Sequence, residues 1–106
     1  MELADGCRDS EYLSALERHL PPVFERARPD IVFFQAGVDP LDGDRLGRLR
    51  LSLEGLRRRD RIVAEAARDA GAPLVLTLGG GYASPIALSV EAHVGTWEEA
   101  RNVFGI

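Results

Sequence analysis

The chain has 106 residues, of which 45% are apolar and 28% charged, and a formal net charge of −4. This length suits one small globular domain, and the composition excludes a low-complexity or disordered chain. The acidic balance gives nucleic acid no overall electrostatic attraction, so we expect no nucleic-acid partner. The single cysteine, Cys7, excludes a disulfide framework and a cysteine-rich zinc site within one chain.

The sequence shows neither a leader nor a membrane segment. Residues 1–5 lack the basic and apolar regions of a signal peptide. No apolar run approaches the roughly 20 residues that cross a bilayer. We therefore expect a cytoplasmic protein without a membrane partner.

The first predicted element is a helix of about eighteen residues, because apolar residues recur along one face at helical spacing. Asp9 is predicted as its N-cap, and Pro29 follows its end. The pair Pro21-Pro22 predicts a kink or a restart within it.

Two strands with a helix between them follow. Residues 31–36 and 74–78 are nearly continuous apolar runs, which predicts strands buried on both faces. Between them, a loop at 38–47 precedes a helix over about 53–70, which Gly71 ends. Strands joined by such a helical crossover are expected to be parallel.

The C-terminal part is predicted to hold two shorter helices. Ser84 and the following Pro85 are typical of a helix start, and this helix is expected to end at Gly95. Thr96 and Glu99 have the spacing of a capping box, which predicts a last short helix.

The order of elements makes the fold class α/β. Parallel strands this apolar need neighbouring strands and helices on both faces, and two strands alone leave open edges. The chain is therefore expected to be part of a larger parallel sheet.

Open α/β sheets bind ligands at the carboxyl ends of their strands, where both Asp39 and Tyr82 are expected. Asp39 precedes a proline that restricts it, and its carboxylate suits metal ligation, acid–base catalysis or a simple turn. The three glycines at 79–81 suit three roles. The first is a phosphate-binding loop, because Gly79, Gly81 and Ser84 nearly match the spacing of the dinucleotide-binding fingerprint. The second is a flexible segment that presents the Tyr82 phenol to a polarised carbonyl, and the third is a tight turn.

For the other polar residues the sequence pattern favours structural roles. His19 and His93 lack a carboxylate or cysteine at ligand spacing, which favours surface or hydrogen-bonded core positions. Arginines concentrated at 45–61 are interspersed with acidic residues, which predicts a solvated helix face rather than a nucleic-acid site. Asp44 is expected to pair with a nearby arginine or to accept backbone N–H bonds.

The segments AGVDPLDGDRLG at 36–47 and LGGGY at 78–82 resemble two loops of the histone deacetylase family. DSEYL at 9–13, RPD at 28–30 and EAH at 91–93 extend the resemblance over nearly the whole chain. It is most specific to the bacterial zinc-dependent deacetylases of the acetoin-utilisation and acetylpolyamine amidohydrolase types. The resemblance implies the three-layer arginase/deacetylase fold, to which this chain would supply two strands and their flanking helices.

The resemblance also implies a site. Asp39 matches an aspartate ligand of the catalytic Zn²⁺, and Tyr82 matches the tyrosine that hydrogen-bonds the acetyl carbonyl and its oxyanion. Leu46 and Gly80 match positions that line the substrate channel. The implied substrate is an acetylated lysine or another acetylated amine.

The sequence departs from the family pattern in its histidines. The family's other zinc ligands lie in an Asp-x-His motif and its acid–base chemistry uses a histidine pair, and neither occurs in residues 1–106. Because a catalytic zinc takes three protein ligands, we expect residues 1–106 to be the C-terminal portion of a deacetylase domain, inactive without its N-terminal part. The alternatives are a non-catalytic interaction module and a phosphate-binding α/β domain that uses the Gly79–Gly81 loop.

Overall fold

The computed structural model describes residues 2–106. In chain order its elements are α1 (Asp9–Ala27), β1 (Val32–Gly37), α2 (Leu53–Asp69), β2 (Leu74–Gly79) and α3 (Ala87–Phe104). The predicted α/β order is confirmed, except that one long helix takes the place of the two predicted at the C-terminus.

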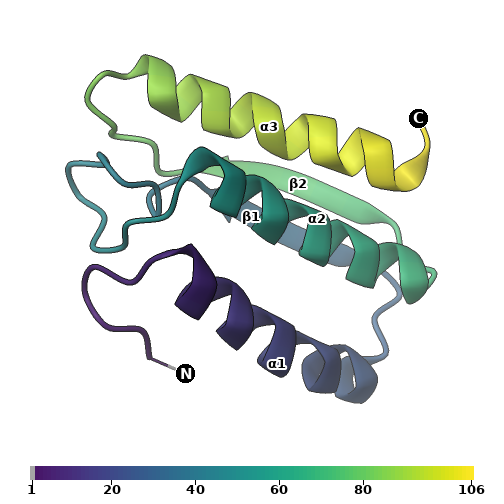
Figure 1. Ribbon diagram of the computed structural model, residues 1–106. Helices are drawn as coiled ribbons and strands as arrows, with labels where there is room; N and C mark the ends of the chain where they lie inside the picture. The colour runs from purple at the N-terminus through teal and green to yellow at the C-terminus, as the bar shows by residue number, and fades with distance from the viewer. Residues whose placement is uncertain (1) are drawn as a thin grey trace.

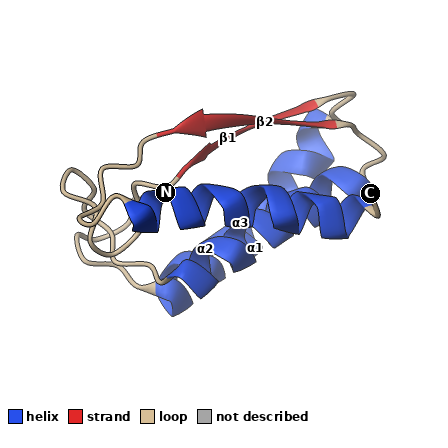
Figure 2. Cartoon of the chain, turned by 90° about the horizontal axis from the view of Figure 1, so that it is seen from above, coloured by secondary structure: helices blue, strands red, loops and turns tan. Residues whose placement is uncertain are grey.

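The two strands form a parallel sheet, which confirms the predicted crossover unit. Their register runs from Val32 opposite Leu74 to Gly37 opposite Gly79. All three helices lie on one face of this sheet (Figure 2). The central helix, α2, lies between α1 and α3 (Figure 1). The described residues therefore form two layers, one of helices and one of strands.

The prediction that the strands are buried on both faces is wrong for residues 2–106. Ala36, which faces the helices, is 0% exposed, whereas Phe33 on the opposite face is 69% exposed. Gln35 and Thr77 lie exposed on that same outer face. The reason is that side chains alternate between the faces of a strand, and helices cover only one face here.

The first two helices are joined at their N-termini by Asp9. The predicted N-cap role of Asp9 is wrong, because Arg8 occupies that position. The Asp9 carboxylate instead accepts hydrogen bonds from the backbone N–H of Ser52, at 2.8 Å, and from the Ser52 hydroxyl. Ser52 is itself the N-cap of α2 and accepts from the Gly55 N–H at 2.9 Å. The first helix runs through the two prolines without restarting.

The break predicted at Gly95 and the capping box at Thr96 are both wrong, because α3 is continuous. Gly95 lies where α3 meets α2, and a methyl group on it would come within 3.1 Å of Arg57 Nε. The Thr96 hydroxyl points into the same interface, 2.7 Å from Asp60 Oδ2. The helix also begins later than predicted from Ser84, with Ile86 at its N-cap.

The core lies beneath the loops at the carboxyl ends of the strands. Its buried apolar members are Val38, Leu41, Leu51, Leu56, Ala83 and Ala92. Since these come from both loops and from two helices, packing fixes the loops relative to one another. Within the described part of the chain, no helix combines the length and apolarity needed to span a bilayer.

Candidate functional site

The loop after β1 and the loop after β2 meet at the carboxyl edge of the sheet, as the parallel strands predict. The Ser84 N–H donates to the Gly43 carbonyl at 3.1 Å, and the Arg45 N–H donates to the Tyr82 carbonyl at 3.0 Å. Residues about forty positions apart are thus held together by main-chain hydrogen bonds. The edge is an ordered surface rather than two independent loops.

Asp39 lies against the glycines at this edge. Its Oδ1 atom is 2.8 Å from where a Cβ on Gly37 would lie and 2.9 Å from the same position on Gly80. Gly80 has φ +63°, a conformation that L side chains rarely adopt, so both shape and backbone require glycine there. The Asp39 carboxylate is exposed and accepts no hydrogen bond from residues 2–106, so its oxygens are free to bind a ligand.

Asp44 fixes the backbone around Tyr82. Its Oδ1 accepts the N–H groups of Leu46 and Gly47, each at 2.9 Å, and its Oδ2 accepts the Tyr82 N–H at 2.8 Å. Burial acts to raise the pKa of Asp44, but these three N–H donors and Arg45 outweigh it and hold the pKa below its ordinary value. The prediction that Asp44 accepts backbone N–H bonds is confirmed.

The side chains of Tyr82 and Leu46 extend to solvent, although their backbone N–H groups are bonded to Asp44. Tyr82 is 49% exposed and Leu46 71% exposed. Exposed apolar and phenolic groups on a fixed backbone are suited to contact with a ligand. The structure therefore brings all four predicted site residues, Asp39, Leu46, Gly80 and Tyr82, to one edge of the sheet.

A cavity of about 280 Å³ opens beside Asp39 and Gly80. Its lining also includes Tyr12 from α1 and Arg59 from α2. Burial is the main cause that raises the pKa of Tyr12, although Arg59 opposes it. The carboxylate thus has an aromatic and a cationic neighbour behind the sheet edge, and neither was among the predicted site residues.

The prediction of a solvated arginine face is wrong for Arg59. This residue is 4% exposed, and its Nε and Nη2 lie 2.8 and 2.7 Å from Asp60 Oδ1. Burial raises the pKa of Asp60, with Arg59 and Thr96 opposing it. The sequence carried a signal for this pair, because both residues fall within the apolar stripe of α2 between Leu56 and Val63.

The two histidines differ in their surroundings. His19 is exposed, as predicted. His93 lies behind the glycine loop, with Nε2 3.4 Å from where a Cβ on Gly81 would be. Its Nδ1 is buried without a hydrogen-bond partner among the described residues, so the prediction of a hydrogen-bonded core histidine is wrong for that nitrogen.

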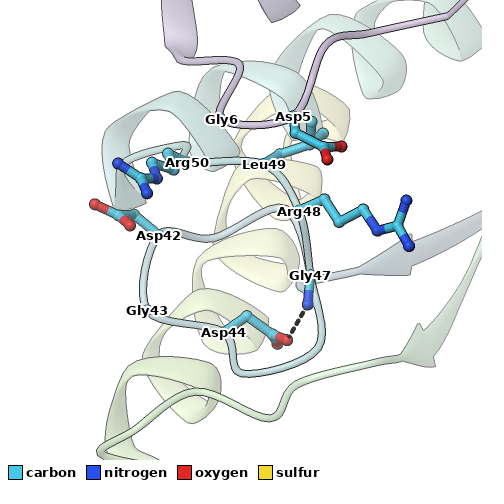
Figure 3. A pocket seen from close by; sticks show the side chains of 9 residues that line it. All are labelled: Asp5, Gly6, Asp42, Gly43, Asp44, Gly47, Arg48, Leu49 and Arg50. Atoms are coloured by element: carbon cyan, nitrogen blue, oxygen red, sulfur yellow. Dashed lines mark hydrogen bonds between the residues drawn. The ribbon is translucent and has the colours of Figure 1, made fainter.

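A second cavity, of about 580 Å³, is lined by the loop after β1 and by Asp5 and Gly6 of the N-terminal segment. Figure 3 shows Asp44 on one wall, bonded to the Gly47 N–H, and Arg48 and Arg50 pointing to opposite sides. Since the two guanidinium groups do not converge, they do not form an anion site.

The glycine loop is likewise unsuited to phosphate. The Asp39 carboxylate contacts Gly80 and the Asp44 carboxylate binds the N–H of the adjoining Tyr82, and these negative charges would repel an anion. The next helix begins only at Ala87, so its N-terminal N–H groups do not follow the glycines directly.

Asp39 and Asp44 both lie at this edge, but three N–H groups already occupy the Asp44 carboxylate, whereas Asp39 lies against the glycines with its oxygens free. No group of three or more histidine, cysteine, aspartate or glutamate residues within residues 2–106 could hold a metal ion. The donor chemistry fits one corner of a zinc site, whose remaining ligands would come from outside these residues.

Comparison with known proteins assigns the family. An uncharacterised protein of Picosynechococcus sp. is 41% identical over 102 residues, which are 96% of this chain and 34% of that protein. Histone deacetylase 2 of Arabidopsis thaliana is 39% identical over 82 residues, 77% of this chain and 21% of that enzyme. The chain thus spans about a third or less of the curated relatives it matches.

The structure agrees with this assignment. Acetylpolyamine aminohydrolase from Burkholderia pseudomallei superimposes on 97% of this chain and 28% of its own with a TM-score of 0.81, at 16% identity. That likeness establishes the arginase/deacetylase fold. The family model of the histone deacetylase domain matches residues 1–97. The chain belongs to the histone deacetylase family.

Proposed function

We propose that this chain is the C-terminal portion of a zinc-dependent deacetylase domain that hydrolyses the amide of an acetylated lysine or another acetylated amine. The observation that carries the proposal is the juxtaposition of Asp39 and the glycine loop. The free carboxylate lies against Gly80, and Tyr82 follows two residues later with its backbone held by Asp44. The spans of the relatives support a larger domain, in which other residues supply the remaining zinc ligands.

Each residue at the edge has a role in this chemistry. Asp39 would bind the metal through its free carboxylate oxygens. When bound, zinc would polarise the acetyl carbonyl and lower the pKa of water. The Tyr82 hydroxyl would donate a hydrogen bond to the carbonyl oxygen and more strongly to the oxyanion that develops from it. Leu46 would give the acyl chain an apolar wall, and Gly80 would leave room beside it.

Two substitutions test the proposal in the complete protein, meaning this chain joined to the rest of its domain. Asp39→Asn should abolish tight zinc binding and deacetylation of an acetyl-lysine reporter, because an amide is a weak zinc ligand. Asp42→Asn is the matched control, because it removes the same charge from the same loop but not from the side that faces Gly79–Gly81. It should leave zinc binding and deacetylation unchanged. Full activity of Asp39→Asn would contradict the proposal.

A further inference from the structure

A buried arginine holds the end of β1. Arg59 extends from α2, and its Nη1 donates to the Gly37 carbonyl at 2.5 Å. The same guanidinium lies over the Phe34 ring, 5.3 Å from its centroid. Arg59 therefore contacts β1 at its last residue and again three residues earlier. These two contacts tie α2 to the carboxyl end of β1.

The anchored strand end supports the Asp39 carboxylate. Gly37 is two residues before Asp39, and Oδ1 of Asp39 lies 2.8 Å from where a Cβ on Gly37 would be. On the neighbouring strand side, the Val38 N–H donates to the Gly79 carbonyl at 3.1 Å. Two hydrogen bonds therefore hold the backbone just before Asp39: one from Arg59 to the Gly37 carbonyl, and one from the Val38 N–H to the Gly79 carbonyl.

Arg59 is in turn oriented by two other residues. Asp60 Oδ1 accepts its Nε at 2.8 Å, and Thr96 of α3 donates to Asp60 Oδ2 at 2.7 Å. Arg59 and Asp60 are 4% and 2% exposed, so both charges are out of water. Replacing such a pair by apolar residues is often neutral or stabilising, so stability alone is a weak reason for its presence. The presence of this buried pair is better explained by the position in which it holds the end of β1.

We propose that Arg59 is a positioning residue for the metal ligand Asp39, held in place by Asp60 and Thr96. The proposal rests on the proposed function and extends it from the sheet edge to the interface between α2 and α3. In this role the guanidinium contacts β1 rather than the substrate or the metal. It acts through the Gly37 carbonyl, so its loss should weaken zinc binding and leave binding of the acetylated substrate intact.

The test compares Arg59→Met with Arg61→Met in the complete protein. Arg61 is the matched control because its Nε and Nη2 donate to the buried Glu99 carboxylate, each at 3.1 Å, without reaching β1. Each variant removes one arginine of α2 from a buried carboxylate, Arg59 from Asp60 and Arg61 from Glu99. The zinc dissociation constant is measured by competition with a chelator, and kcat and KM are measured on an acetyl-lysine reporter.

Arg59→Met should raise the zinc dissociation constant about tenfold, the lower end of the range for groups that support a metal ligand. It should lower kcat with little change in KM, and Arg61→Met should change neither the zinc constant nor kcat. Equal zinc constants in the two variants would overturn the proposal.

A milder variant covers the case in which Arg59→Met does not fold. Thr96→Val keeps Arg59 and removes only the hydroxyl that holds Asp60, so the zinc dissociation constant should rise about threefold. A folded Thr96→Val protein with an unchanged zinc constant would overturn the proposal. If the parent protein binds no zinc, or if Asp39→Asn binds it as tightly, the proposed function fails and this inference fails with it.

Discussion

Gly80 offers the sharpest test of the geometry around Asp39, with Gly71 as its control. Both glycines have a positive φ, +63° and +70°. For an L residue the left-handed conformation costs about 1–2 kcal/mol. Alanine at either position should therefore lower the free energy of unfolding by at least about that much. The surroundings differ, because a Cβ at Gly71 would meet nothing within 4 Å.

At Gly80 the added methyl group would meet Asp39 itself. It would lie 2.9 Å from Oδ1, 3.2 Å from Cβ and 3.3 Å from the backbone nitrogen of Asp39. The oxygen can rotate away, but the Cβ and the nitrogen cannot, so Asp39 must shift by a few tenths of an ångström. Metal–ligand distances hold to within about 0.2 Å, so this shift is large enough to weaken a zinc bond.

The assay is zinc competition and thermal unfolding of the complete protein. Both variants should melt lower, Gly80→Ala by more because its methyl group also displaces Asp39, and only Gly80→Ala should raise the zinc dissociation constant, by about tenfold or more. Equal zinc constants in Gly80→Ala and Gly71→Ala would refute the placement of Asp39 at the metal.

Three further predictions concern Tyr82, Asp44 and the outer sheet face. Tyr82→Phe should lower kcat about 10²–10³-fold with little change in KM, as steady-state kinetics would show; a near-normal kcat would make the tyrosine structural. Asp44→Asn should lower stability by about 1–3 kcal/mol near neutral pH, because charged acceptors bind N–H groups more strongly than an amide does. The folded pKa of Asp44 lies below its ordinary 3.8, so this stabilisation is complete above that value and lost as the pH falls through the folded pKa. Urea unfolding of both proteins from pH 7 to pH 2 should show the difference shrinking, and a pH-independent difference would contradict it. Because Phe33 is 69% exposed on the outer sheet face, we expect isolated residues 1–106 to associate through that face, and Phe33→Ser should reduce this association in light scattering. Unchanged association would exclude the outer sheet face as its cause.

Local sequence signals predicted the elements well where local chemistry decides. Apolar runs located both strands to within one residue, and α2 begins at the predicted Leu53 and ends two residues before Gly71, the predicted stop signal. The helix break at Gly95 was wrong because a distant group decided it. Thr96 bonds to Asp60, 36 residues earlier, and the capping-box pattern contains no information about that partner.

The candidate site divides in the same way. Asp39 and Tyr82 were predicted from their places at strand ends, which the parallel topology brings to one edge. The contribution of Arg59 was missed, because an arginine among many exposed ones does not show that it is buried. Its position in the apolar stripe of α2 was the available signal, and only the packing of α2 on β1 reveals what it holds.

The most direct test of the central claim is a crystal structure of the complete protein with anomalous data at the zinc edge. We predict an anomalous peak about 2.0–2.2 Å from an Asp39 carboxylate oxygen, with the Tyr82 hydroxyl facing the same site. A zinc ion bound elsewhere, with Asp39 free of metal, would contradict the account.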